Sequence, residues 1–241
     1  MERSLDQNGV NLINGILPGR KEQLIEVSVF LFLIVPSMVL SLFVVKPGGA
    51  LTFVLVAWST ILRDLALVSL ILFFLWRNRE PVNQIGWMIR GGRKEIFLGV
   101  ILFVPLFFGA GLLENILHAS GLSVPSKPLP SFFAAKGAAE TAMAVILVII
   151  VALAEETIFR GYLLLRFNAV TQSPATAVFL SAVIFSIGHG YEGSAGVITV
   201  GVMGAALALV YMWRRSLVAP IIMHFLQDFV SIVIIPLLGN K

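Results

Sequence analysis

Seven apolar segments make up most of this chain, and they restrict its fold more than any other feature of the sequence. They cover residues 24–45, 51–76, 96–117, 137–165, 175–189, 195–213 and 217–238. A helix that crosses a membrane needs about 20 apolar residues. Because 58% of the 241 residues are hydrophobic and only 12% are charged, against about 25% charged in a soluble domain, a soluble globular fold is excluded. We predict an all-α, polytopic integral membrane helical bundle of about seven transmembrane helices.

The distribution of polar residues and prolines divides the chain into three parts. Residues 1–23 are polar and are predicted to form a cytoplasmic N-terminal tail. Residues 24–136 hold three peripheral spans and a Pro-rich linker, and residues 137–241 hold the other four spans as a core. The chain has no cysteine, which excludes disulfides, thiolate nucleophiles and cysteine-based metal sites.

The positive charges predict the orientation in the membrane, because cytoplasmic loops carry an excess of Lys and Arg. With a cytoplasmic N-terminus, eleven of these residues fall on the cytoplasmic side, four fall on the other side and two lie inside spans. The cytoplasmic set is Arg3, Arg20, Lys21, Arg77, Arg79, Arg90, Arg93, Lys94, Arg166, Arg214 and Arg215, and the opposite set is Lys46, Lys127, Lys136 and Lys241. The net charge of +4 therefore reflects loop topology, and we expect the lipid bilayer, and no nucleic acid, as a partner.

Ionisable side chains at membrane depth are costly and indicate function, and the fourth apolar segment carries three of them. Glu156 and Arg160 are spaced i, i+4 with the acid first, which favours an ion pair within the helix. That pair neutralises both charges and leaves Glu155 on a different face, without a partner along its own helix. A carboxylate in such a position is suited to act as a general base.

Two histidines and an aspartate stand in later segments. His189 follows Phe185 at the end of the fifth segment, while His224 and Asp228 are spaced i, i+4 in the seventh and so project from one face. At a rise of about 1.5 Å per residue, Glu155 and both histidines lie about 10–20 Å from the cytoplasmic ends of their helices. We therefore expect these three side chains to line one water-filled cavity that opens toward the cytoplasmic half.

The remaining ionisable residues of the apolar segments have simpler interpretations. Arg63 and Asp64 lie in the middle of the second segment, where they brace helices or support the site. As direct neighbours they point about 100° apart, so they need not pair with each other. The residues near segment ends are interpreted as interfacial, and these are Glu26, Glu114, Glu140 and His118.

The polar residues of the core fit several chemistries. A carboxylate, two imidazoles and a further acid, without a thiol or a serine motif, favour activation of water over a covalent nucleophile. Glu155, His189, His224 and Asp228 are also suitable ligands for zinc, so a zinc-dependent membrane protease is a second hypothesis. A third is a non-catalytic membrane immunity or chaperone-like binding protein that keeps the same helical cavity. A transporter is disfavoured, because the acids cluster in one half without an internal repeat.

Three short motifs, in this order and on separate segments, carry a family resemblance. The motifs Glu155-Glu156-x-x-x-Arg160, Phe185-x-x-x-His189 and His224-x-x-x-Asp228 resemble those of the CAAX-protease and bacteriocin-processing (CPBP or Abi) family of intramembrane endopeptidases, over roughly residues 137–230. The resemblance implies a glutamic-type peptidase without a metal or other cofactor, which cleaves a membrane-associated peptide or protein. Glu156, Arg160 and Phe185 would support the site. The minimal loops resemble those of prokaryotic members and imply a prokaryotic cytoplasmic (inner) membrane.

By the same resemblance, Glu155 and His189 activate the attacking water, while His224 and residue 228 stabilise the oxyanion. The eukaryotic-type prenyl proteases of the family have Asn where this chain has Asp228. An ionised Asp cannot donate a hydrogen bond to an oxyanion. Asp228 is therefore either protonated, or it orients His224 and leaves that imidazole as the sole donor.

The charge distribution leads to a first test, which concerns topology. A tag inserted at Arg90 should stay unlabelled by a membrane-impermeant reagent in sealed cells and become labelled after permeabilisation, because loop 77–94 is predicted to be cytoplasmic. A tag at Lys127 is the matched control and should be labelled without permeabilisation. Labelling at Arg90 from outside intact cells would contradict the orientation.

Overall fold

The computed structural model describes residues 18–41, 52–88, 92–124 and 135–239, and these residues form helices and the connections between them. In chain order the elements are α2 (Arg20–Ser41), α3 (Phe53–Arg77), η1 (Val82–Ile85), α4 (Arg93–Ala119), α5 (Gly137–Glu155), η3 (Glu156–Leu163), α6 (Leu164–Thr171), α7 (Pro174–Ile187), η4 (Gly190–Glu192), α8 (Gly193–Arg214), α9 (Val218–Asp228), η5 (Phe229–Ile234) and α10 (Ile235–Gly239). Two of them, η3 and η5, are wound as π-helix. Most of the predicted tail and of the Pro-rich linker lies outside the described residues.

Five helical stretches of the described residues are long and apolar enough to cross a membrane. They are Phe53–Arg77, Arg93–Ala119, Gly137–Thr171, Gly190–Arg214 and Val218–Leu238. The predicted class, an all-α integral membrane protein, is confirmed, but the count of seven spans is not. The apolar helix Pro174–Ile187 has 14 residues and reaches only about 21 Å, less than the roughly 30 Å of a hydrocarbon core. The first predicted span is described only as far as Ser41, as α2.

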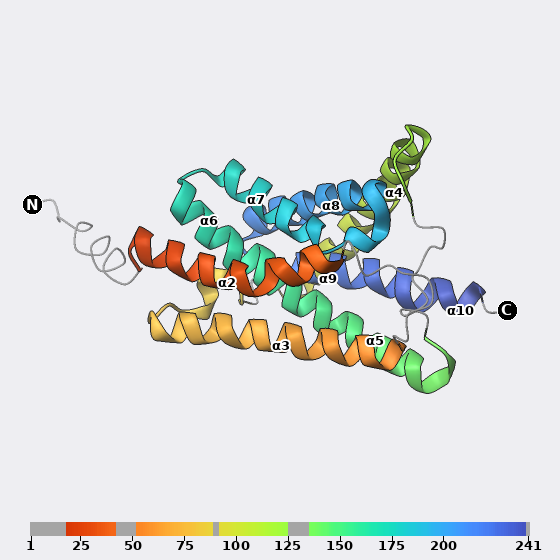
Figure 1. Ribbon diagram of the computed structural model, residues 1–241, viewed down its shortest axis with the longest axis horizontal. Helices are drawn as coiled ribbons and strands as arrows, with labels where there is room; N and C mark the ends of the chain where they lie inside the picture. Colours follow the sequence, from red (N-terminus) through yellow and green to blue (C-terminus); the bar gives the residue numbers. More distant parts are fainter. Residues whose placement is uncertain (1–17, 42–51, 89–91, 125–134, 240–241) are drawn as a thin grey trace, which may run out of the picture.

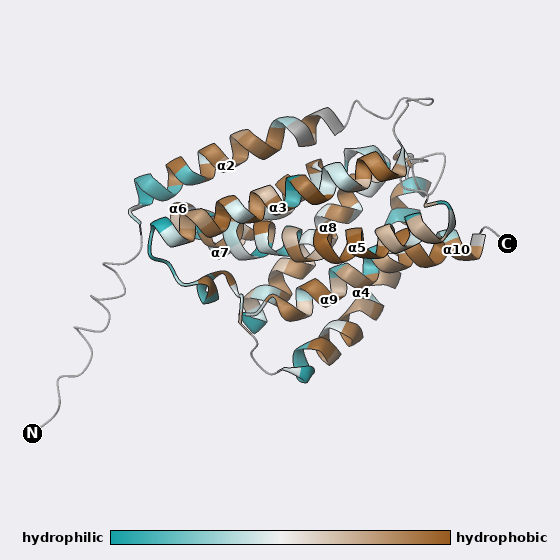
Figure 2. Ribbon diagram, turned by 90° about the horizontal axis from the view of Figure 1, so that it is seen from below, coloured by the Kyte–Doolittle hydropathy of each residue, from teal (hydrophilic) through white to brown (hydrophobic). Residues whose placement is uncertain are grey.

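The helices lie side by side in a bundle (Figure 1), with α3 along α5, α4 along α9 and α7 along α8. Figure 2 shows that the helices consist largely of hydrophobic residues, and many large hydrophobic side chains are exposed. Phe32, Trp76 and Phe108, for example, are 76%, 75% and 70% exposed. An apolar surface on this scale is unfavourable in water, so these outer faces are suited to lipid contact.

The π-helical segment η3 lies in the interior of the bundle, where all eight of its residues are buried. Two glycines allow other elements to come close to it. A Cβ atom on Gly161 would lie 2.8 Å from the carbonyl oxygen of Ile85, and one on Gly204 of α8 would lie 3.0 Å from the Phe185 ring and 3.3 Å from Arg160. The site residues of η3 are therefore closely surrounded by α7, α8 and η1.

A buried polar cluster joins α2 and α6 to the chain just after α3. Arg166 is 1% exposed and donates hydrogen bonds of 2.9 and 2.7 Å to the two carboxylate oxygens of Glu80. It also lies 3.4 Å from Glu26, which accepts a 2.7 Å hydrogen bond from Asn78. The interpretation of Glu26 as an interfacial residue was therefore wrong, because α6 places a buried cation against it.

The cluster leads to a second prediction, which concerns stability. Arg166→Gln should lower the free energy of unfolding by about 3–5 kcal/mol, because it leaves buried carboxylates without their cation. Thermal unfolding in detergent, followed by circular dichroism, measures this loss. Arg77→Gln removes an exposed charge from the last turn of α3 and, as the matched control, should change stability by less than about 0.5 kcal/mol. Equal stability of the two variants would contradict a structural role for the cluster.

Candidate active site

An ion pair within η3 forms the centre of the candidate site. Glu156 and Arg160 are 0% and 1% exposed, and Arg160 Nη1 donates to Glu156 Oε1 at 2.8 Å, which confirms the predicted pair. Arg160 Nη2 donates to the carbonyl oxygen of Gly204 in α8 at 3.3 Å. The guanidinium also lies 4.2 Å from the centre of the Phe185 ring in α7. Because a buried charge is stable only with such partners, the pair brings three helices together.

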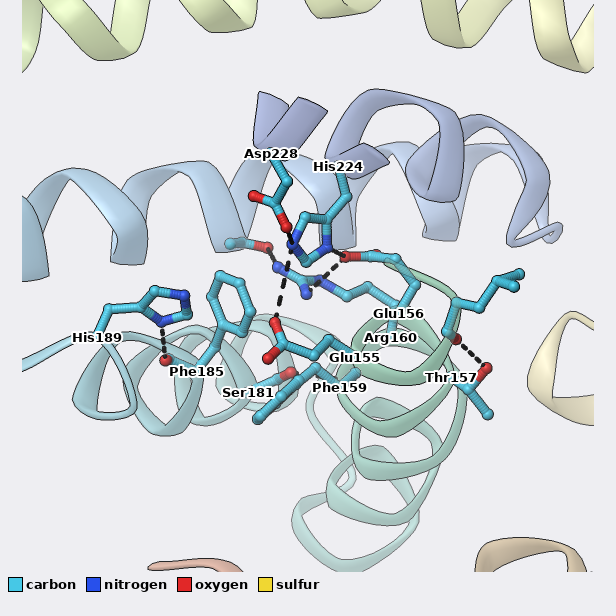
Figure 3. A network of polar contacts seen from close by, with 12 residues as sticks. Glu155, Glu156, Thr157, Phe159, Arg160, Ser181, Phe185, His189, His224 and Asp228 are labelled. Atoms are coloured by element: carbon cyan, nitrogen blue, oxygen red, sulfur yellow. Dashed lines mark hydrogen bonds and ion pairs between the residues drawn. The ribbon is translucent and has the colours of Figure 1, made fainter. Parts of the chain in front are cut away.

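His224 connects α9 to this ion pair (Figure 3). It is buried, and its Nδ1 lies 2.8 Å from Glu156 Oε1. An ionised carboxylate only accepts hydrogen bonds, so Nδ1 is the donor. The other ring nitrogen, Nε2, lies 3.5 Å from Asp228 Oδ2 and 3.8 Å from Glu155 Oε2. These distances are too long for hydrogen bonds, so both carboxylates act on the ring through charge. Among the described residues, no three His, Asp or Glu side chains are placed to bind one metal ion.

Glu155, the last residue of α5, is directed differently from Glu156. Successive helical residues point about 100° apart, so one glutamate faces the ion pair and the other borders a cavity of about 170 Å³. Arg63 and Asp64 of α3 line the same cavity. The sequence left open whether these two neighbours pair, and in the structure they do, at 2.9 Å between Arg63 Nη2 and Asp64 Oδ1. The long arginine side chain is able to reach back to the adjacent carboxylate despite the angle between the two residues.

His189 lies apart from the other predicted site residues. Its Nδ1 is 3.0 Å from the carbonyl oxygen of Phe185, and Figure 3 shows the Phe185 ring between His189 and His224. The Phe185 ring centre is 4.8 Å from that of His189 and 6.0 Å from that of His224. Within the described residues, no hydrogen bond or ion pair joins His189 to Glu155, His224 or Asp228. The cavity at Glu155 includes neither histidine, so the expected cavity shared by all three residues is not found there.

A comparison with models of known protein families bears directly on this arrangement. Residues 137–230 match the model of the Rce1-like family, which is described as type II CAAX prenyl endopeptidase Rce1-like. The match covers less than half of the chain, and it supports assignment of this segment to the CAAX-protease family. Comparisons with curated proteins and with solved structures gave no match. The family assignment made from the three motifs is therefore confirmed, and the family points to a protease.

The Rce1-like segment contains every site residue that the sequence predicted, and these are Glu155, Glu156, Arg160, Phe185, His189, His224 and Asp228. Sequence reasoning missed two hydrogen bonds that hold η3. Trp87 Nε1 donates to Thr157 Oγ1 at 3.0 Å, and Ser181 Oγ donates to the carbonyl oxygen of Phe159 at 2.8 Å. No charge or motif marks these residues, so the sequence contains no signal for them. Arg63 and Asp64 reach the site from outside the Rce1-like segment, and their position inside an apolar run was the only sign of a role.

Proposed function

We propose that the protein is an intramembrane endopeptidase that hydrolyses a peptide bond of a membrane-associated peptide or protein, with Glu155 as the base that activates water. The observation that carries this proposal is the approach of Glu155 Oε2 to His224 Nε2, at 3.8 Å, within a segment that matches a protease family. A carboxylate and an imidazole that face each other at membrane depth are suited to general acid–base catalysis.

In the proposed reaction, Glu155 accepts a proton from a water molecule while the hydroxide attacks the carbonyl carbon of the scissile peptide bond. Protonated His224, with Nδ1 held by Glu156, donates from Nε2 to the oxyanion that develops. Glu155 then gives its proton to the amide nitrogen, the C–N bond breaks, and an acid and an amine are released. Asp228 orients His224. The part of His189 in activating water stays a prediction, because the Phe185 ring lies between it and His224.

The location of the protein follows from the same reasoning. The apolar helices and the Rce1-like segment make it an integral membrane protein. We place it in the cytoplasmic membrane of a prokaryote, with the N-terminus in the cytoplasm. The minimal loops and the distribution of Lys and Arg residues support this placement.

The proposed base leads to a third prediction. Glu155→Gln keeps the shape of the side chain but removes the base, so it should lower the rate of peptide cleavage by about 10²–10⁴-fold or more. The fold should stay intact. The measurement is cleavage of a membrane-anchored peptide library by purified protein, together with thermal unfolding of each variant.

Glu156→Gln is the matched control at the adjacent position. It leaves buried Arg160 without its anionic partner and should therefore lower stability and activity together. If Glu155→Gln kept full activity while Glu156→Gln was inactive but fully stable, the assigned roles would be reversed. Glu156 would then be the base, and Glu155 would have a structural role. Binding of peptides without any cleavage by the wild-type protein would favour a non-catalytic binding protein.

A fourth prediction concerns metal and Asp228 together. If water is activated without a metal, cleavage should survive exhaustive chelation, and Asp228→Asn should be tolerated because an amide is able to donate to an oxyanion without first taking up a proton. A zinc enzyme would behave in the opposite way, since Asp228→Asn would remove an anionic ligand and chelators would abolish activity that added zinc restores. Metal analysis of both proteins beside one cleavage assay distinguishes the two outcomes.

A further inference from the structure

The cavity at Glu155 is built by two parts of the chain that are far apart in sequence. Residues of α2 and α3, outside the Rce1-like segment, form one side of it, and the junction of α5 and η3 forms the other. Its apolar lining consists of Leu33, Ile34, Met38, Leu67, Ile158 and Phe159, and its ionisable lining consists of Arg63, Asp64 and Glu155. The apolar helix α3 thus carries a polar pair to the proposed base, and α2 adds apolar side chains.

Asp64 presents a buried acceptor in this cavity. The residue is 1% exposed, and its Oδ1 accepts from Arg63 Nε at 3.0 Å and lies 2.9 Å from Nη2. Its other oxygen, Oδ2, is buried and has no hydrogen-bond partner among the described residues. Because a buried carboxylate oxygen without a partner is costly, this atom is suited to accept a hydrogen bond from a bound molecule.

Arg63 presents donors beside that acceptor. Its side chain is 49% exposed, although the residue lies near the middle of α3, at membrane depth. A guanidinium has five N–H donors, and only some of them are directed at Asp64, so the others remain for a second acceptor. A charged group at this depth needs polar surroundings, which water or a bound polar molecule in the cavity would supply.

The ligand that fits a neighbouring donor and acceptor is a peptide backbone. A peptide that is extended for cleavage exposes N–H and C=O groups, which cannot stay unpaired within a membrane. Arg63 is able to donate to a backbone carbonyl oxygen, and Asp64 Oδ2 is able to accept from a backbone N–H. A free carboxylate fits less well, because Asp64 already offsets the charge of Arg63 and Glu155 adds a further negative charge nearby.

We propose that Arg63 and Asp64 bind the backbone of the substrate peptide in the cavity lined by α2, α3 and the junction of α5 and η3, and hold it beside Glu155. This inference rests on the proposed endopeptidase function. It assigns substrate binding to the half of the chain that precedes the Rce1-like segment. The pair acts on binding, so its removal should raise KM and leave kcat nearly unchanged.

The first experiment uses N-palmitoylated decapeptides with a C-terminal fluorescein, tested on the full-length protein in detergent. The double variant Arg63→Gln/Asp64→Asn replaces both charged groups by neutral amides, so neither charge is left alone. We expect a 10- to 100-fold increase in KM for cleaved peptides, as for loss of a hydrogen bond to a charged group. The Kd for binding to the Glu155→Gln protein should rise by a similar factor. Arg77→Gln, which removes an exposed charge from the same helix, should leave both constants unchanged.

The second experiment asks whether the contact is to the backbone. Replacing single amide bonds of the peptide by esters removes one N–H at a time. At one position the ester should weaken binding to Glu155→Gln protein at least tenfold, and it should have little effect when Asp64 is also changed to Leu, which has a similar shape but no acceptor. The same test is run on peptides that have a free C-terminus in place of the fluorescein. If amidation of that terminus, rather than loss of an N–H, abolishes the dependence on Arg63, the ligand is a carboxylate and the proposal is wrong.

These outcomes separate this inference from the proposed function. Cleavage with an unchanged KM in the double variant would overturn the backbone contact and leave the endopeptidase intact. Binding that depends on the pair, without any cleavage by the wild-type protein, would overturn the endopeptidase alone. If no peptide binds the Glu155→Gln protein, both are wrong. Unchanged thermal unfolding of each variant shows that the fold is kept.

Discussion

The candidate site depends on a single buried carboxylate oxygen, Glu156 Oε1, which contacts side chains from two helical elements. It accepts from Arg160 and from His224, each at 2.8 Å, and thereby joins η3 to α9. Arg160 extends the connection to α8 through the carbonyl oxygen of Gly204, and to α7 through the face of Phe185. Removing one partner would leave another charge buried and unpaired, which costs several kcal/mol. The helices that carry the site are therefore held in position by electrostatics as well as by apolar packing.

Both helices that carry the central cluster change their winding at the site. The π-helix η3 begins at Glu156, directly after the proposed base, and η5 begins directly after Asp228. A π-helix pairs residues i and i+5 in place of i and i+4, so it rotates the following residues relative to an α-helix and changes the carbonyl groups available to other partners. Ser181 donates to one of these carbonyl groups, that of Phe159. Short π-helical turns are common at functional sites, and here they adjoin the proposed catalytic residues.

Local spacing predicted the i, i+4 ion pair within η3, but it predicted neither the pair of adjacent residues Arg63 and Asp64 nor the contacts between helices. The i, i+4 spacing correctly placed Glu156 beside Arg160, and the apolar run at residues 51–76 became the helix Phe53–Arg77. The bond from Glu156 to His224 depends on how two helices are rotated against each other, which no spacing in one segment determines. The same reason explains the error at Glu26, whose partner Arg166 comes from α6. The π-helical winding was not predicted either, because no residue preference in the segment distinguishes it from an α-helix.

Glu155 and Glu156 show why the chemical role of a residue follows from its partners rather than from its type. They are identical side chains at one depth, yet Glu156 is fully buried with a guanidinium and an imidazole on one oxygen. Its charge is already offset, so taking up a proton would break the contacts that hold the helices together. Glu155 is 14% exposed, and its nearest cationic partner is His224, at 3.8 Å. It has access to the cavity shared with Asp64. A base must be able to gain and lose a proton without disturbing the fold, and of the two glutamates only Glu155 meets that condition.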